Sequence, residues 1–288
     1  MSPAGPSRGR SQSAERQGSP MTGPFRVAAI QTVSAPSVAV NLAAAGELIG
    51  AAAAQGARLV VLPEWFCFIG AGERDKLALG EADGDGPIQG FLARAAREHR
   101  VWLVGGSLPL ATADPGKVRN ACLVFDDAGR RIARYDKIHL FDFTGPAEKY
   151  RESNTIEPGR EPMAIDSPFG RIALSICYDV RFPELYRRLA PMDLITVPSA
   201  FTVTTGEAHW ETLLRARAIE NLAWVIAPAQ GGEHPTGRRT FGHTMIVNPW
   251  GEVVARLARG PGVVVADIDP SYQQMRRESL PALSHRVL

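Results

Sequence analysis

Between Phe25 and the C-terminus, short apolar runs alternate with segments of helical periodicity. The runs at 25–32, 58–64 and 101–107 are predicted strands, and helices are predicted over 41–55 and 88–99. Strands that are apolar on both faces must be covered on both faces. The alternation therefore predicts a layered α/β sandwich with helices on at least two faces.

The second half of the chain continues this pattern. Hairpins are predicted over 121–141, with a turn at Asp127–Gly129, and over 243–257, with a turn at Pro249–Gly251; further strands are predicted over 171–177, 193–199, 223–230 and 262–269, and helices from Phe182, over 207–222 and at the C-terminal end. Because no linker and no internal repeat interrupts the pattern, residues 23–288 are predicted to form one domain.

Residues 1–22 have a different composition from the rest of the chain. They are rich in Ser, Pro, Gly and Arg and have almost no apolar side chains. Such a segment cannot bury enough surface to offset its loss of conformational entropy. It is therefore predicted to be a disordered N-terminal tail.

Charge and cysteine content argue against several classes of partner. The formal net charge is only +2 and the basic residues are scattered, so neither nucleic acid nor a membrane surface is indicated, and no apolar run is long enough to span a bilayer. The three cysteines do not suggest a disulfide framework, which favours a reducing cytoplasm. No Cys-x-x-Cys, His-x-x-x-His or phosphate-binding glycine motif occurs, so no metal or organic cofactor is expected.

Three residues that could take part in catalysis are placed at strand ends: Glu64, Lys137 and Cys177. Glu64, taken alone, fits a solvated carboxylate, but an apolar setting would suit a general base. Lys137 is one of only four lysines among 32 basic residues, although a surface lysine is the simpler interpretation. Cys177 begins the turn into a helix, where backbone N–H groups and the helix dipole favour a thiolate. Cys67 and Cys122 are interpreted as buried structural thiols.

Taken together, these three side chains predict nucleophilic catalysis. The Cys177 thiolate would attack a carbonyl carbon, and Glu64 would take the thiol proton and later activate water. The Lys137 ammonium and the N–H of Tyr178 would stabilise the tetrahedral oxyanion. A carboxylate base thus replaces the histidine that is missing near Cys177 in the sequence.

The segments LPEWF, RYDKIHLFD and SICYDVRFPELYR, in this order, resemble the three catalytic segments of the nitrilase (carbon–nitrogen hydrolase) superfamily. The resemblance extends from Phe25 to the C-terminus and maps the family's Glu–Lys–Cys triad onto Glu64, Lys137 and Cys177. It implies an αββα sandwich, paired as αββα–αββα in a homodimer or higher oligomer. It also implies a second glutamate after the lysine, for which Glu152 is the first candidate and Glu148 the second.

The residues after the nucleophile resemble the amidase branch, which includes ω-amidases and deaminated glutathione amidases. The resemblance implies hydrolysis by water of a small carboxylate-bearing amide of the deaminated-glutathione type, to an acid and ammonia, through a cysteinyl thioester. α-Ketoglutaramate and N-carbamoyl or other amides remain alternatives. Tyr178, Arg181, Phe201 and Thr202 are predicted to bind substrate, although Arg181 could instead form a structural ion pair with Asp179 or Glu184.

Other classes of function are less well supported. A papain-like thiol hydrolase would need a histidine, and His139, two residues after Lys137, would lie on the same face of a strand. His209 could line the site, while Trp210 is predicted to be core. A catalytically silent binding protein with this fold is the alternative from a different class, since fold alone does not determine function.

Overall fold

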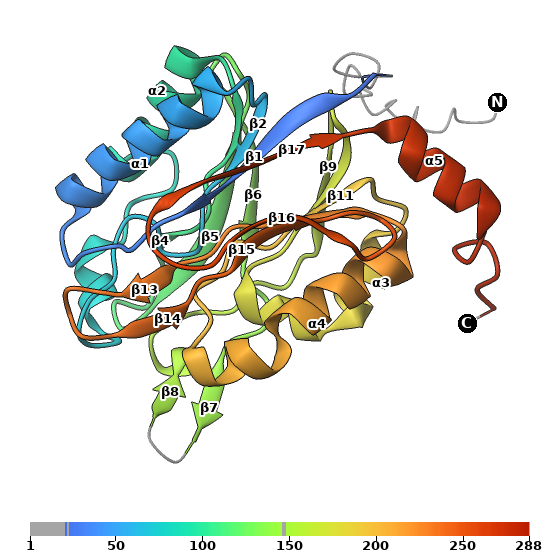
Figure 1. Cartoon of the computed structure of the whole chain (residues 1–288). Coiled ribbons are helices and arrows are strands. Elements are labelled where there is room, and N and C mark those ends of the chain that lie inside the picture. The colour runs from blue at the N-terminus through green and yellow to red at the C-terminus, as the bar shows by residue number, and fades with distance from the viewer. Residues whose placement is uncertain (1–20, 22, 146–147, 288) are drawn as a thin grey trace, which may run out of the picture.

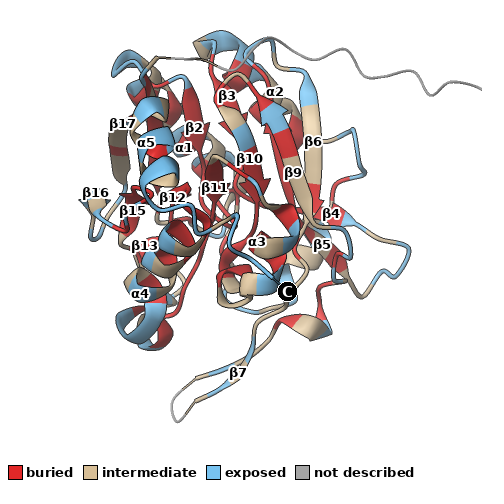
Figure 2. Cartoon of the chain, turned by 90° about the vertical axis from the view of Figure 1, so that its right-hand side faces the viewer, coloured by how far each residue is buried: buried red, intermediate tan, exposed pale blue. Residues whose placement is uncertain are grey.

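The computed structural model describes residues 21, 23–145 and 148–287. Figure 1 shows two β-sheets packed face to face, with α1 and α2 outside one sheet and α3 and α4 outside the other. This order of layers, helix–sheet–sheet–helix, confirms the predicted α/β sandwich. Figure 2 shows the buried residues concentrated in the strands and the exposed residues on the outer helix faces.

The first sheet has seven strands, of which β1, β2 and β3 are parallel. In spatial order they are β17 (Gly262–Ile268), β1 (Phe25–Gln31), β2 (Leu59–Val61), β3 (Trp102–Val104), β5 (Val118–Phe125) and β4 (Leu108–Ala111), and β6 (Arg131–Asp136) also pairs with β5. Its outer face is covered by α1 (Val38–Ala54) and α2 (Pro87–His99), the helices that connect the parallel strands.

The second sheet has six strands, of which β10, β11 and β12 are parallel. In spatial order they are β16 (Val253–Leu257), β15 (Thr244–Val247), β12 (Trp224–Ala227), β11 (Leu194–Thr196), β10 (Gly170–Leu174) and β9 (Met163–Ser167). The helices α3 (Pro183–Leu189) and α4 (Val203–Asn221) connect its parallel strands and cover its outer face.

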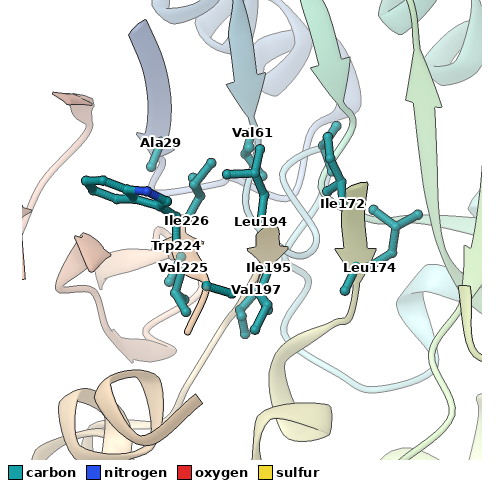
Figure 3. Close-up of a cluster of buried hydrophobic side chains, with 14 of the residues drawn as sticks. Ala29, Val61, Ile172, Leu174, Leu194, Ile195, Val197, Trp224, Val225 and Ile226 are labelled. Atoms are coloured by element: carbon teal, nitrogen blue, oxygen red, sulfur yellow. The ribbon is translucent and has the colours of Figure 1, made fainter. Parts of the chain in front are cut away.

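The alternation of side chains along β1 explains how one strand serves two layers. Val27 and Ala29 belong to the core between the sheets, whereas Ala28 and Ile30 belong to the core under α1 and α2. Figure 3 shows Ala29 and Val61 of the first sheet beside side chains of the second sheet. A fully buried valine such as Val61 contributes about 1.5–3 kcal/mol.

The remaining elements lie outside the two large sheets. They are the hairpins β7 (Asp142–Thr144) with β8 (Lys149–Arg151) and β13 (Gly231–Glu233) with β14 (Arg239–Phe241), the helix α5 (Pro270–Ser279), and the 3-10 turns η1 (Asp75–Leu79), η2 (Glu152–Asn154) and η3 (Cys177–Arg181). The sequence did not predict these two hairpins or the strands β4 and β9. These strands are at most five residues long; β4 contains a proline, and the others mix polar with apolar positions.

The predicted strand over 131–141 is too long. β6 ends at Asp136, where its pairing with Ala121 of β5 is the last step of the ladder. Lys137 still donates its backbone N–H to the Asn120 carbonyl at 2.9 Å. His139 lies beyond this contact, so the prediction that it shares a strand face with Lys137 is wrong.

The predicted tail, residues 1–22, lies outside the described residues except for Met21. The backbone N–H of Met21 donates to the Pro168 carbonyl at 2.8 Å. Within the described part of the chain, no helix is both long and apolar enough to cross a lipid bilayer.

Candidate active site

Three strand ends bring Glu64, Lys137 and Cys177 together. Glu64 follows β2 and Lys137 follows β6, both in the first sheet, while Cys177 follows β10 in the second. The loop that carries Glu64 packs closely against Gly106, which follows β3. A Cβ at this position would lie only 2.1 Å from the Pro63 carbonyl oxygen. Only glycine, here at φ +60°, permits this close approach.

The Lys137 ammonium is the centre of a buried ionic cluster. Its Nζ lies 2.9 Å from Glu64 Oε1 and 2.8 Å from Glu152 Oε2, and Lys137 and Glu64 are each only 2% exposed. Of the two glutamates considered from the sequence, Glu152 contacts Lys137. Glu148 instead accepts a hydrogen bond from the Tyr150 hydroxyl at 3.3 Å.

The charges in this cluster stabilise one another. Burial opposes the charge on Lys137, but the carboxylates of Glu152 and Glu64 outweigh it and hold the pKa of the ammonium well above its usual value. Burial also opposes the charge on Glu152, yet the ammonium and the Phe141 N–H keep the pKa of that carboxyl below its usual value. The ammonium therefore stays protonated and can stabilise a developing oxyanion.

Asn120, in β5, is a member of the cluster that the sequence did not predict. Its Nδ2 donates to Glu64 Oε1 at 2.9 Å and to Glu152 Oε1 at 3.2 Å. The other oxygen of Glu64 accepts the Ala200 N–H at 2.9 Å. These bonds fix both carboxylates. In the sequence, Asn120 is marked only as a polar residue directly before the apolar run that begins at Ala121.

Cys177 occupies a strained turn. Its φ is +51°, which is uncommon for a residue with a side chain, and its N–H donates to the Pro198 carbonyl at 2.9 Å. Burial and the neighbouring Glu64 carboxylate raise the pKa of the thiol well above its usual value, although Lys137 acts in the opposite direction. The expectation that the turn favours a resting thiolate is therefore wrong. The turn is only one short 3-10 element. Its effect on the pKa of the thiol is outweighed by burial and by the Glu64 carboxylate.

Asp179, two residues after Cys177, organises the turn. Its fully buried carboxylate accepts hydrogen bonds from the Tyr135 hydroxyl at 2.7 Å, the Ile176 N–H at 2.9 Å and the His139 N–H at 3.0 Å. The His139 ring also lies 2.7 Å from it through Nδ1. The predicted alternative of an ion pair between Arg181 and Asp179 is therefore wrong.

Two adjoining recesses open onto Cys177. Together with the open solvent at the mouth, the larger measures about 440 Å³ and the smaller about 210 Å³. All four predicted substrate-binding residues line the smaller recess: Tyr178, Arg181, Phe201 and Thr202. The larger recess is lined by the ionic cluster and by residues that the sequence analysis did not select: Trp65, Glu73, Lys76, Phe141, Tyr150, Ala200 and Arg238.

Arg181 is held by aromatic rings. Its guanidinium carbon lies 5.6 Å from the Tyr178 ring centroid and 5.5 Å from that of Phe201. The predicted ion pair with Glu184 is also absent among the described residues. The guanidinium instead contacts His209 Nδ1 at 3.3 Å, while Trp210 is fully buried, as predicted.

The carbon–nitrogen hydrolase family model matches residues 26–277. The chain belongs to this family, and it is an amidohydrolase that acts on carbon–nitrogen bonds other than peptide bonds.

Among curated relatives, it is similar to the deaminated glutathione amidase of Synechocystis sp., with 44% identity over 92% of this chain and 98% of the relative. It is also similar to that of Mus musculus, with 42% identity over 90% and 82%. Among solved structures, it resembles the Caenorhabditis elegans NitFhit protein, with a TM-score of 0.83, 41% identity and coverage of 92% and 66%. These similarities confirm the family and fold predicted from the sequence.

Proposed function

We propose that the chain hydrolyses a small carboxylate-bearing amide of the deaminated-glutathione type, with Cys177 as nucleophile. The observation that carries this proposal is the Lys137 ammonium held between Glu64 and Glu152 beside the Cys177 thiol. The relatives named deaminated glutathione amidase support the choice of substrate.

In the first half of the reaction, Cys177 Sγ attacks the amide carbon as its proton passes to Glu64. Lys137 and the Tyr178 N–H stabilise the oxyanion. The carbon–nitrogen bond then breaks, and the leaving nitrogen takes the proton from Glu64. In this scheme a raised thiol pKa is consistent with catalysis, because Glu64 removes the proton during the attack.

In the second half, Glu64 takes a proton from water, and the hydroxide adds to the thioester carbonyl. Collapse of this intermediate releases the acid, and Cys177 recovers its proton from Glu64. The net reaction consumes one amide and one water and gives one acid and one amine. Glu152 and Asn120 hold Lys137 and Glu64 in position and take no proton.

The nature of the amine follows from the substrate. Glutathione has one primary amine, on its γ-glutamyl part, and only secondary amides. Its deaminated form would therefore release cysteinylglycine when the γ-amide is cleaved. The ammonia expected from the sequence would be released from a primary amide such as α-ketoglutaramate.

The test uses both substrates, because they share one acyl group and must form the same acyl-enzyme. We expect α-ketoglutarate with cysteinylglycine from the first and α-ketoglutarate with ammonia from the second. Intact mass should detect a single adduct on the wild type, and Cys177→Ala should abolish turnover and adduct together. Turnover that persists in Cys177→Ala would overturn the nucleophile. Absence of turnover on both substrates would redirect the search to ureido acids and other amides.

We also propose a cytoplasmic homodimer paired as αββα–αββα, with residues 23–288 forming the hydrolase domain and residues 1–22 a tail. The resemblance to the family supports this arrangement. Light scattering during size-exclusion chromatography of the full chain tests the dimer, and a monomer mass would exclude it.

A further inference from the structure

The larger recess has two cationic side chains that the proposed chemistry does not use. Lys76, in η1, and Arg238, in the turn between β13 and β14, both line it together with Cys177 and Glu64. Neither forms an ion pair with any acidic side chain in the described part of the chain. Lys76 Nζ makes one long contact of 3.4 Å with Thr155 Oγ1, and the buried Arg238 Nε has no hydrogen-bond partner among the described residues.

Aromatic rings hold both cations at the wall of the recess. Lys76 Nζ lies 5.3 Å from the Trp65 ring centroid, and the Arg238 guanidinium lies 5.3 Å from that of Tyr150. Trp65 and Tyr150 line the same recess. A cation fixed over a ring loses less freedom when it binds an anion, which favours a preorganised site.

The recess as a whole is neutral, since three cations and three carboxylates line it, but the two cations outside the buried cluster face only one of these carboxylates. Apart from the buried cluster around Lys137, its wall carries Lys76, Arg238 and one carboxylate, Glu73. Glu73 already accepts the Arg151 N–H at 2.9 Å. Burial lowers the pKa of Lys76 below its usual value, and Arg238 adds to this effect against the opposing influence of Glu152. A bound carboxylate would relieve the repulsion between the two cations.

The position of Glu64 assigns the two recesses to the two halves of an amide. Glu64 lines the larger recess and not the smaller one. Since Glu64 gives its proton to the leaving nitrogen and Arg181 lines the smaller recess, we place the amine half in the larger recess. The acyl half then occupies the smaller recess beside Arg181.

We infer that Lys76 and Arg238 form a subsite for a carboxylate on the leaving amine, so that the enzyme selects amides whose amine half is an amino acid or a short peptide. This inference rests on the proposed function and adds the residues that bind the carboxylate of the leaving peptide. A substrate of this class has one anionic group at each end, facing Arg181 on the acyl side and Lys76 with Arg238 on the amine side.

The test compares deaminated glutathione with its analogue in which the terminal glycine carboxylate is a carboxamide. The acyl group, the scissile bond and the length of the two substrates are the same. We expect kcat/KM of the wild type to be at least about tenfold higher for the acid than for the carboxamide, mainly because KM is lower for the acid. This is the size of effect expected for a hydrogen bond to a charged group. In Lys76→Gln combined with Arg238→Gln, this ratio should fall to near one.

Exposed neighbours of the same type serve as matched controls. Lys149 and Arg239 are exposed and line neither recess, so Lys149→Gln and Arg239→Gln should keep the wild-type ratio. A wild-type ratio near one, or an unchanged ratio in the double variant, would overturn the inference and leave the proposed function standing. Turnover of neither substrate by the wild type would overturn both. If the double variant does not fold, the wild-type ratio still tests whether the carboxylate is selected, and the single variants Lys76→Gln and Arg238→Gln test the two residues.

Discussion

The Tyr135 hydroxyl donates a 2.7 Å hydrogen bond to the Asp179 carboxylate. Tyr135 is in β6, two residues before Lys137, and Asp179 is two residues after Cys177. This contact therefore joins the segment that carries the ammonium to the turn that carries the thiol. Asp179 is fully buried, and every donor around it needs an oxygen acceptor.

Asp179→Asn should destabilise the fold and reduce turnover. The amide nitrogen would face donors such as the Tyr135 hydroxyl and the Ile176 N–H, which would lose their acceptor. We expect a loss of about 2–4 kcal/mol in the free energy of unfolding and a fall in kcat of at least about tenfold. Urea denaturation and steady-state kinetics measure both. Tyr135→Phe, which removes a single bond, should cost about 1 kcal/mol. Equal stability of Asp179→Asn and wild type would contradict this role.

His139→Gln should retain thioester formation. The His139 ring lies against Asp179 and stacks on Phe182 with ring centroids 3.7 Å apart, and among the described residues it makes no hydrogen bond to Cys177. We therefore expect the acyl-enzyme to appear by intact mass in His139→Gln at a rate within about tenfold of the wild type. Glu64→Gln should lose it, because the base is gone. The opposite pattern would indicate papain-like catalysis.

The sequence predicted the positions of Glu64 and Cys177 at strand ends because each follows a run that must be buried, whereas Lys137 follows the mixed run RIARYD and was selected by its residue type. It did not predict which neighbours they meet, because Asn120 and Ala200 come from elements far away in the chain. The scarcity of lysine that drew attention to Lys137 applied equally to Lys76, but only the fold places Lys76 in the recess.

The acidity of Cys177 was predicted in the wrong direction for a related reason. The turn and its N–H groups are local and visible in the sequence, whereas burial and the distance to Glu64 depend on how the two sheets meet. The contacts of Arg181 were also predicted wrongly, because they too depend on the fold. Nearby acids in the sequence suggested an ion pair, but Asp179 is occupied by other donors and Arg181 turns to the rings of Tyr178 and Phe201.

Asn120→Ala should lower activity more than its effect on stability explains. The substitution removes the donor shared by Glu64 and Glu152, so both carboxylates gain freedom around Lys137. We expect kcat/KM to fall by about 10–100-fold, as for a charge-assisted hydrogen bond. Asn221→Ala is the matched control, because this buried asparagine of α4 donates to the Arg217 carbonyl and does not line either recess. If Asn120→Ala and Asn221→Ala have similar kinetics, Asn120 has only a structural role.

Alkylation of Cys177 by iodoacetamide should rise with pH without reaching a plateau by pH 9. The reactive form is the thiolate, and burial with Glu64 holds the pKa of this thiol well above its usual value. Cys122 should contribute little, because burial raises its pKa to about 12, and burial raises the pKa of Cys67 as well. Mass spectrometry of wild type against Cys177→Ala isolates the signal. A plateau near neutral pH would demonstrate a resting thiolate instead.

The ionic cluster should make stability depend on pH through Glu152. Its pKa in the folded state lies below the ordinary 4.5, because Lys137 outweighs the effect of burial. The stabilisation from the ionised form is therefore present above about pH 4.5 and is lost as pH falls through the folded-state pKa, by at most about 1.4 kcal/mol per pH unit. Urea unfolding between pH 6 and pH 3 should show a steeper loss for the wild type than for Glu152→Gln, which has no proton to bind at this position. Glu152→Gln should also start from a lower free energy of unfolding, since it leaves Lys137 with one carboxylate fewer. Parallel curves for the two proteins would mean that the Lys137–Glu152 contact does not shift the pKa of Glu152 in solution.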